Sequence, residues 1–438
     1  MTQVSQLPFA PVLEGEDRKI RVLTLSDHPM SKSGIGIQAH QLITSLLDTG
    51  RYTFFSIGGA QKHAVIQPQM VQPYNQDWII QPVEGFGDPQ LMRQWLMAYR
   101  PDAILIFTDP RFFIWTFQME EEIRDICPIL FWTVWDNEPT PAYNKHLYSS
   151  CDDIAWFSRF SYEFHKDLET DAEFHCVPLA RNTDIFKPAS EADRKSFKIQ
   201  LLTWAKRKAF TAFFVSRNAR RKRPADVLLA WKYFLDGLPP EVLEDAETCP
   251  LLLMHTDPMD QEGPNLLQVL EMLDLSKYVS ISPGKCSDED MAKLYSMVDV
   301  TLNLSLNEGF GMSVHESLLC GTPCITTKTG GMTEQMTDGE QVFGELLEPD
   351  VKSLVGSQLV PYIYEDIVDP KKFAEAIRRM YDKTEEERTE MGLAGREHLL
   401  TNNSIDNILT SWDTILTNRV EEYKNPERIR AKLVRLKG

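Results

Sequence analysis

The sequence predicts an α/β protein with two consecutive domains, each built on a parallel sheet that helices cover on both faces. The main observation is that short apolar runs alternate with stretches whose apolar residues follow helical spacing. The alternation stops at a polar, charged segment, residues 187–208, and starts again at residue 209. Size agrees, because 438 residues suffice for two or three domains of about 150 residues each.

The first half contains a series of strand candidates. The run at residues 20–26 is followed by a glycine-containing turn and a predicted helix over 37–47. Further strands are expected at 52–57, 103–107, 129–134, 154–157 and 174–177, with a helix over 89–99. Ligands of such sheets bind beyond the carboxyl ends of the strands, so with two such domains we expect the site in the cleft between them.

The second half repeats the pattern and ends in helices. Strands are expected at 209–216, 251–255, 279–282, 300–304 and 324–327, and helices from 371 to about 423. The expected domains are an N-terminal domain at 1–190, a connector at 191–208, a second domain at 209–400 and C-terminal helices at 401–438.

Charge and cysteine content exclude several classes of protein. The 64 acidic and 46 basic residues give a net charge of −18, which disfavours binding to long nucleic acids. The seven cysteines are odd in number and form no CxxC pair, which is typical of a reducing compartment. The N-terminus does not resemble a signal peptide, and no apolar run reaches the roughly 18 residues of a membrane span. We therefore expect a cytoplasmic protein.

The richest segment is residues 303–323, NLSLNEGFGMSVHESLLCGTP. An apolar strand leads into a loop with Glu308, Gly309 and Gly311, and a predicted helix follows. Glycines let backbone amides approach a ligand, and a helix N-terminus favours an anion. Glu308 and Glu316 can accept hydrogen bonds from sugar hydroxyls. Without further information, a plain loop with helix-start acids is an equal alternative.

The sequence EGFGMSVHE, followed by ESLLCGTP and TGGMTEQM, resembles the Glu-x7-Glu signature of retaining GT-B glycosyltransferases of group 1, such as mannosyltransferases, sucrose synthases and glycogen synthases. The resemblance implies the GT-B fold, with two Rossmann-like doubly wound domains facing across a cleft. The first domain would bind the acceptor and the second the donor, and the last helix would cross back to the first. It implies that Glu308 contacts the donor sugar, that Glu316 holds the ribose, and that sugar and phosphate meet the amides of Gly309, Phe310, Gly311, Met312 and Ser313.

Two further segments are similar to family elements that face the donor diphosphate. VSRNARRKRP resembles the strand–Arg–x4–Lys element, which assigns Arg217 and Lys222 to the diphosphate. A guanidinium and an ammonium would neutralise this leaving group. The alternative is a solvated basic run, because three more arginines lie nearby. SKSGIGIQAH is similar to the glycine loop after the first strand, which assigns Gly34 and Gly36.

Two segments depart from the family pattern. VPLARNTDIFKP is similar to the exit from the first domain, but residues 179–182 lack the usual Asn-Gly. In TVWDNEPTP, the usual His-Asp is Trp135-Asp136. Asp136 is carried over as an acidic catalytic partner, whereas the histidine has no counterpart. Trp135 either stacks on a sugar or fills the core, and the core is favoured.

Several other residues are expected to serve the structure rather than the chemistry. Asp288 and Asp290 follow Ser287, a pattern that predicts a helix start more than a metal site. Cys320 and Cys324 are expected in the core, and His315 is assigned no role. The aromatic stretch 107–117 either lines an acceptor cleft or fills the first domain, and the core is favoured. A basic tail packs on the protein or, as a weaker alternative, contacts an anionic membrane through Arg428, Arg430, Lys432, Arg435 and Lys437.

The function implied by the resemblance is retaining transfer of a sugar from a UDP- or GDP-linked donor to an acceptor hydroxyl, without metal or other cofactor. The catalytic residues would be Asp136, Arg217, Lys222 and Glu308. The acceptor stays open among glycan, lipid, protein, small molecule and modified base, and so does the oligomeric state. The alternatives are a catalytically impaired nucleotide-sugar-binding protein and a GT-B epimerase or phosphorylase.

Overall fold

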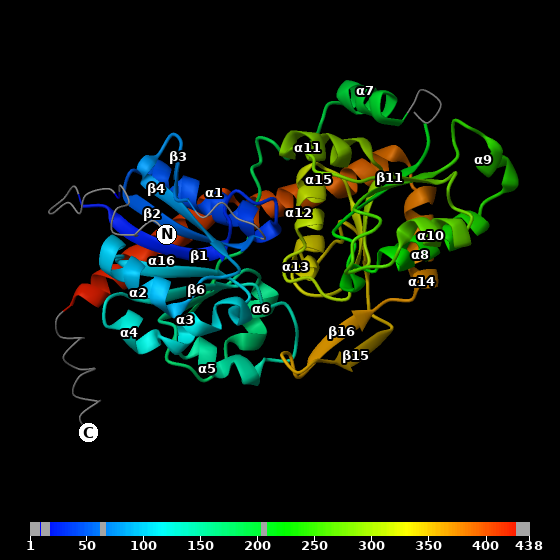
Figure 1. Ribbon diagram of the computed structural model, residues 1–438. Helices are drawn as coiled ribbons and strands as arrows, with labels where there is room; N and C mark the ends of the chain where they lie inside the picture. The colour runs from blue at the N-terminus through cyan, green and yellow to red at the C-terminus, as the bar shows by residue number, and fades with distance from the viewer. Residues whose placement is uncertain (1–8, 10–17, 62–66, 203–207, 426–438) are drawn as a thin grey trace. The chain divides into compact units, whose positions relative to one another are not determined.

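The computed structural model describes residues 9, 18–61, 67–202 and 208–425, and the chain forms two compact units (Figure 1). The first unit comprises residues 1–135, 140–179 and 405–438, and the second comprises 136–139 and 180–404. In the described part of the chain, no helix has both the length and the apolar character that a membrane span requires.

The first unit contains an eight-stranded sheet in the order β3-β4-β2-β1-β5-β6-β7-β8. All pairs are parallel except the antiparallel pair β3–β4. The strands are β1 (Ile20–Asp27), β2 (Tyr52–Gln61), β3 (Gln69–Val71), β4 (Asn75–Glu84), β5 (Ala103–Thr108), β6 (Ile129–Thr133), β7 (Asp153–Trp156) and β8 (Glu173–Cys176). The six predicted strands are confirmed as β1, β2, β5, β6, β7 and β8, whereas β3 and β4 are not predicted because their polar residues and Pro82 mask the pattern.

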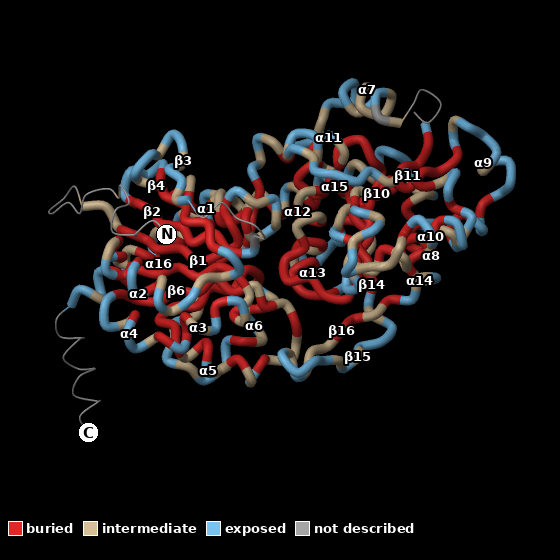
Figure 2. Tube along the Cα trace, viewed as in Figure 1, coloured by how far each residue is buried: buried red, intermediate tan, exposed pale blue. Residues whose placement is uncertain are grey.

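Helices bury apolar faces against this sheet, whose strands are largely buried (Figure 2). Helix α1 (Gly34–Asp48) begins at Ser33, whose side chain accepts a hydrogen bond from the amide of Gly36. The other helices are α2 (Pro89–Tyr99), α3 (Ile114–Gln118), α4 (Glu120–Arg124), α5 (Lys145–Tyr148), α6 (Arg159–His165) and the C-terminal α16 (Ile405–Lys424). Trp412 of α16 packs edge-on against Trp132 of β6, with ring centroids 5.4 Å apart.

The second unit contains a six-stranded parallel sheet in the order β11-β10-β9-β12-β13-β14. The strands are β9 (Thr211–Val215), β10 (Leu251–His255), β11 (Val279–Ser282), β12 (Val300–Asn303), β13 (Cys324–Thr327) and β14 (Gly344–Leu347). The chain runs outward from β9 to β11 and then returns to the other side of β9 at β12. The carboxyl ends of β9 and β12 therefore form a topological switch point, where sheets of this kind bind ligands.

The expected connector, residues 191–208, is in its described part the helix α7 (Glu191–Leu202), which groups with the second unit. Phe197 and Leu202 pack against the core beside α11, and Lys198 pairs with Asp299 at 3.1 Å. The remaining helices are α8 (Pro224–Asp236), α9 (Pro240–Glu244), α10 (Leu266–Met272), α11 (Asp288–Met297), α12 (Met312–Leu319), α13 (Met332–Met336), α14 (Pro370–Asp382) and α15 (Glu385–Asn402). A separate antiparallel hairpin pairs β15 (Val351–Val355) with β16 (Ile363–Ile367).

Candidate functional site

The switch point of the second unit brings together two loops that are far apart in the sequence. The loop after β9 contains a short 3-10 helix, Arg220–Lys222, and the loop after β12 contains Glu308. The amide of Leu306 donates to the carbonyl of Arg221 at 2.8 Å, and the guanidinium of Arg221 donates to the carbonyl of Asn307 at 3.0 Å. These bonds fix the two loops edge to edge.

Glu308 is at the centre of a buried charged cluster on these loops. Its Oε1 forms an ion pair with Nζ of Lys222 and accepts a hydrogen bond of 3.0 Å from the Ser305 hydroxyl. Its Oε2 lies 3.6 Å from Nη1 of Arg221. Only 10% of the Glu308 side chain and 13% of the Lys222 side chain are exposed. The cluster is thus held rigidly, with little access for water.

Glu308 is a carboxylate rather than a carboxylic acid. Burial by itself raises the pKa of Glu308, but the charges of Lys222 and Arg221 outweigh burial and lower that pKa to about 2. Burial lowers the pKa of Lys222 from its usual value, and the neighbouring Glu308 charge opposes this effect. We therefore describe the pair as charged, with a carboxylate and an ammonium in direct contact.

Glycines shape the loop between Glu308 and α12. Gly330 has φ +53°, and a Cβ there would lie 1.8 Å from the carbonyl oxygen of Glu308. The next amide, that of Gly331, donates to the same oxygen at 3.1 Å. Gly311, with φ +87°, precedes α12, and no described side chain caps this helix. Uncapped first-turn amides favour an anion.

The other loop residues hold this conformation. Phe310 is buried, and its carbonyl accepts a hydrogen bond from the side chain of Gln335. The Ser313 hydroxyl accepts a hydrogen bond of 3.2 Å from the side-chain amide of Asn303. Gly309 lies in the loop, and Met312 and Ser313 form the start of α12.

Glu316 lies on α12 in a second charged group. Its Oε1 is 2.9 Å from Nε of Arg181, and its Oε2 accepts a hydrogen bond of 2.9 Å from the Tyr295 hydroxyl. Arg181 also pairs with Asp288 at 2.7 Å. Burial raises the pKa of Glu316, and Arg181 opposes this shift. A carboxylate with both oxygens already engaged is oriented for further hydrogen bonds from a ligand.

The remaining predicted residues lie outside these two groups or at their border. Arg217 is 64% exposed and binds Asp260 through two hydrogen bonds of 2.7 and 3.0 Å. Asp136 lies 3.9 Å from Nη1 of Arg221, so it borders the Glu308 cluster. Gly34 and Gly36 belong to the first unit, where a Cβ on Gly36 would fall 2.2 Å from the Ser31 hydroxyl.

Most of the residues that we expect to have only a structural role lie where that role requires. Ser287 caps α11 by accepting from the amide of Asp290, which confirms the helix-start pattern. Cys320, Cys324 and Trp135 are buried. His315 is buried against Phe310. In the aromatic stretch, Phe107, Phe113 and Phe117 are buried, whereas Phe112 is exposed and stacks on Phe86. The basic residues of the tail lie outside the described residues.

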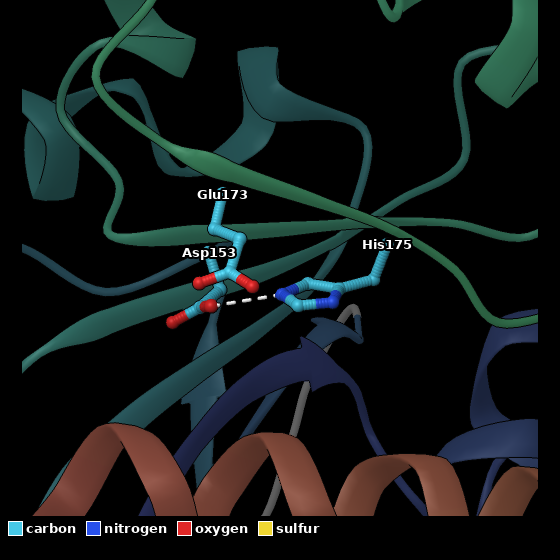
Figure 3. Close-up of side chains that lie close together, drawn as sticks. All are labelled: Asp153, Glu173 and His175. Carbon is cyan, nitrogen blue, oxygen red and sulfur yellow. Dashed lines mark hydrogen bonds and ion pairs between the residues drawn. The ribbon is translucent and has the colours of Figure 1, made fainter.

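Three ligand-type side chains gather on the first unit, as Figure 3 shows for Asp153, Glu173 and His175. His175 contacts Asp153 at 2.9 Å. However, Arg419 also binds Asp153 through two hydrogen bonds of 2.5 and 2.9 Å and Glu173 at 3.0 Å. Because a guanidinium already neutralises these carboxylates, the group fits an ion-pair network better than a metal site.

Sequence reasoning missed Arg181 and Arg221. The family motif assigns Arg217 and Lys222 in this run of basic residues, and it gives no role to Arg221. Arg181 stands in the segment that departs from the family pattern, and that departure is the signal that could have identified it. Its guanidinium joins Glu316 to Asp288, a contact between positions distant in sequence.

Comparison with known proteins finds similarity to glycosyltransferases. Residues 204–398 match the family model described as glycosyl transferases group 1. N-acetyl-alpha-D-glucosaminyl L-malate synthase of Bacillus anthracis is 28% identical over 211 residues, which are 48% of this chain and 46% of the relative. The chain thus matches a little under half the length of that relative.

Solved structures establish the fold. Sucrose-phosphate synthase from Thermosynechococcus elongatus superposes with a TM-score of 0.70 at 16% identity, over 91% of this chain and 99% of the other. HepE of Anabaena, in complex with UDP and glucose, superposes with a TM-score of 0.68 at 14% identity, over 91% and 100%. The expected two-domain GT-B fold is confirmed.

Proposed function

We propose that this protein is a group 1 glycosyltransferase that moves a sugar from a nucleoside diphosphate to an acceptor hydroxyl. The family match over 204–398 covers both loops of the switch point, and the likeness to HepE with UDP favours a UDP-linked donor. The single observation that carries the proposal is the buried cluster of Lys222, Arg221 and Glu308 beside the uncapped start of α12.

The cluster suits the charge changes of this reaction. As the bond between the anomeric carbon and the diphosphate breaks, negative charge grows on the leaving group and positive charge on the sugar. Lys222, Arg221 and the first-turn amides of α12 would stabilise the former, and the Glu308 carboxylate the latter. Arg217 would join by exchanging Asp260 for the diphosphate, since its present ion pair is exposed.

Retention and independence of metal are part of the proposal. The acceptor oxygen would bond to the anomeric carbon on the face that the diphosphate leaves, and the acceptor proton would pass to a diphosphate oxygen. The protein would contribute position and charge rather than a nucleophile. Cationic side chains would neutralise the leaving group, so turnover should persist in excess chelator.

The test compares two carboxylates that differ in role. Glu316→Gln should weaken binding of both UDP and the donor, because a ribose contact is made equally in ground and transition states. Glu308→Gln should reduce turnover by at least about tenfold while leaving UDP binding nearly intact, because its contact strengthens in the transition state. Calorimetry with UDP and initial rates with UDP-sugars measure both. Loss of UDP binding in Glu308→Gln, with Glu316→Gln unaffected, would reverse the assignment.

A further inference from the structure

Strand β16 of the separate hairpin contacts all the loops that meet at the switch point, although it belongs to neither large sheet. We propose that the β15–β16 hairpin is a positioning element, which holds residues 136–139 beside the Glu308 cluster and so fixes Asp136 for the transfer step. The role in transfer rests on the proposed function, whereas the holding of the segment does not.

The first contact is made by the backbone of Tyr364. Its amide donates to the carbonyl of Glu138 at 2.7 Å. Its carbonyl accepts from the side-chain amides of Asn307 at 2.8 Å and Asn137 at 3.2 Å. Tyr364 lies opposite Leu354 in the antiparallel hairpin, at a position whose backbone groups point away from the partner strand. One residue of β16 therefore joins segment 136–139 to the loop that carries Glu308.

The second contact is an ion pair between the hairpin and the segment. Nζ of Lys352 on β15 lies 2.7 Å from Oε2 of Glu138 and 5.3 Å from the centroid of the Tyr364 ring. This pair fixes segment 136–139 from the β15 side. Residues 136–139 accordingly group with the second unit, while Trp135 and Thr140 on either side group with the first.

The next two residues of β16 hold the cluster loops themselves. Glu365 forms an ion pair with Arg220, two residues before Lys222. The amide of Asp366 donates to the carbonyl of Leu306 at 3.0 Å, and its carboxylate accepts from the hydroxyl of Thr329 at 2.7 Å. Three consecutive residues thus position the segments that carry Asp136, Lys222 and Glu308.

The geometry gives the arrangement a chemical consequence. Nη1 of Arg221 lies 3.9 Å from Asp136 and 3.6 Å from Glu308, so one guanidinium serves two carboxylates on different segments. A displaced segment 136–139 would remove Asp136 from this cation without touching the nucleotide contacts. Turnover should then fall more than UDP affinity does.

The test reverses one charge of the hairpin ion pair in the full chain. Lys352→Glu places two carboxylates together, and the double variant Lys352→Glu/Glu138→Lys restores opposite charges. The control is Arg379→Glu, whose ion pair with Glu345 has the same distance, 2.7 Å, and lies away from these loops. Hydrogen exchange of peptides containing residues 135–138 and 364 reports on the contact, calorimetry reports UDP affinity, and initial rates with UDP-sugars report turnover.

We expect faster exchange in both peptides and about fivefold lower turnover for Lys352→Glu, with UDP affinity changed less than about twofold. The double variant should recover most of both losses, and Arg379→Glu should change neither. Unchanged exchange, no recovery in the double variant, or an equal fall in affinity and turnover would overturn the proposal. If the wild type neither binds UDP nor turns over any donor, the proposed function fails, and exchange alone decides whether the hairpin holds the segment.

Discussion

At the scale of single residues, burial separates two kinds of ion pair in the second unit. The pair of Lys222 and Glu308 is removed from water, and desolvation of two charges is so costly that such a pair gains little over apolar residues of the same volume, although loss of one partner is destabilising. Arg217 and Asp260 form an exposed pair that can exchange partners at low cost. Because apolar residues could fill the same space without this cost, the buried charges favour a functional role for Lys222 and Glu308.

The pKa of Glu308 leads to a prediction about pH. Because that pKa is lowered from 4.5 to about 2, the charged form stabilises the fold above pH 4.5, and this contribution is lost as the pH falls toward 2. Glu308→Gln also removes the carboxylate partner of the buried Lys222, whereas Arg221 keeps Asp136. We expect it to lower the free energy of unfolding at pH 7 by about 3 kcal/mol.

Urea unfolding of the wild type and of Glu308→Gln at pH 7, 5 and 4 measures the difference between their free energies of unfolding. The difference should be largest at pH 7 and should narrow below pH 4.5, because the unfolded wild type then takes up a proton at Glu308, whereas the folded protein keeps the carboxylate charged. Glu122→Gln is the control, because its ion pair with Arg93 is fully exposed and should matter little. A Glu308→Gln difference that grows as the pH falls would contradict the assignment of a charged pair.

At the scale of elements, the loop between β12 and α12 depends on a second segment for its shape. Gly330 and Gly331 lie against the Glu308 backbone, and Met332 of α13 packs on Gly311. The loop therefore has a fixed conformation even though it carries glycines. Such preorganisation is what a site needs when its amides are to meet a ligand without further folding.

We expect Gly330→Ala to disrupt this element. Its Cβ would lie 1.8 Å from the Glu308 carbonyl oxygen at a positive φ, so the Glu308 backbone must move. Gly339→Ala is the matched control, because Gly339 also has a positive φ, +98°, but no atom lies within 4 Å of the added carbon. Both should lower the melting temperature, and only Gly330→Ala should also weaken UDP binding by about tenfold or more. Equal UDP affinity in the two variants would contradict this account.

The sequence predicts elements and loops well where the pattern is local. Strands β9 and β12 are apolar runs, and Lys222 and Glu308 follow them in the chain, so the sequence predicts both loops. That β12 lies beside β9 follows from the order of the strands in the sheet, which the sequence does not predict. The role of β16 could not be predicted, because its contacts with Glu138 and Leu306 use the backbone. Arg181 could not be assigned from the resemblance either, because the family pattern has no residue at that position whose role could be transferred.

At the scale of the whole molecule, the chain returns to its first unit at the end. Helix α16 packs on strands that lie more than 200 residues earlier in the sequence, and Arg419 is at the centre of that contact. Its side chain is 9% exposed and binds Asp153, Glu173 and Glu422. Asp153 and Glu173 also belong, with His175, to the group that resembles a metal site, and the guanidinium takes the place that a cation would occupy.

This arrangement predicts that Arg419 stabilises the first unit and that no metal ion does so through these residues. Arg419→Met keeps most of the apolar stem but leaves the buried Asp153 uncompensated, so the free energy of unfolding should fall by about 3 kcal/mol or more. Arg378→Met, which removes an exposed pair with Asp382, should have little effect. In wild-type protein, neither zinc nor excess chelator should shift the melting temperature, since Arg419 already occupies the carboxylates. A rise in wild-type melting temperature with zinc that chelator reverses, together with an unaltered Arg419→Met variant, would show that the three side chains bind metal and that the guanidinium is dispensable.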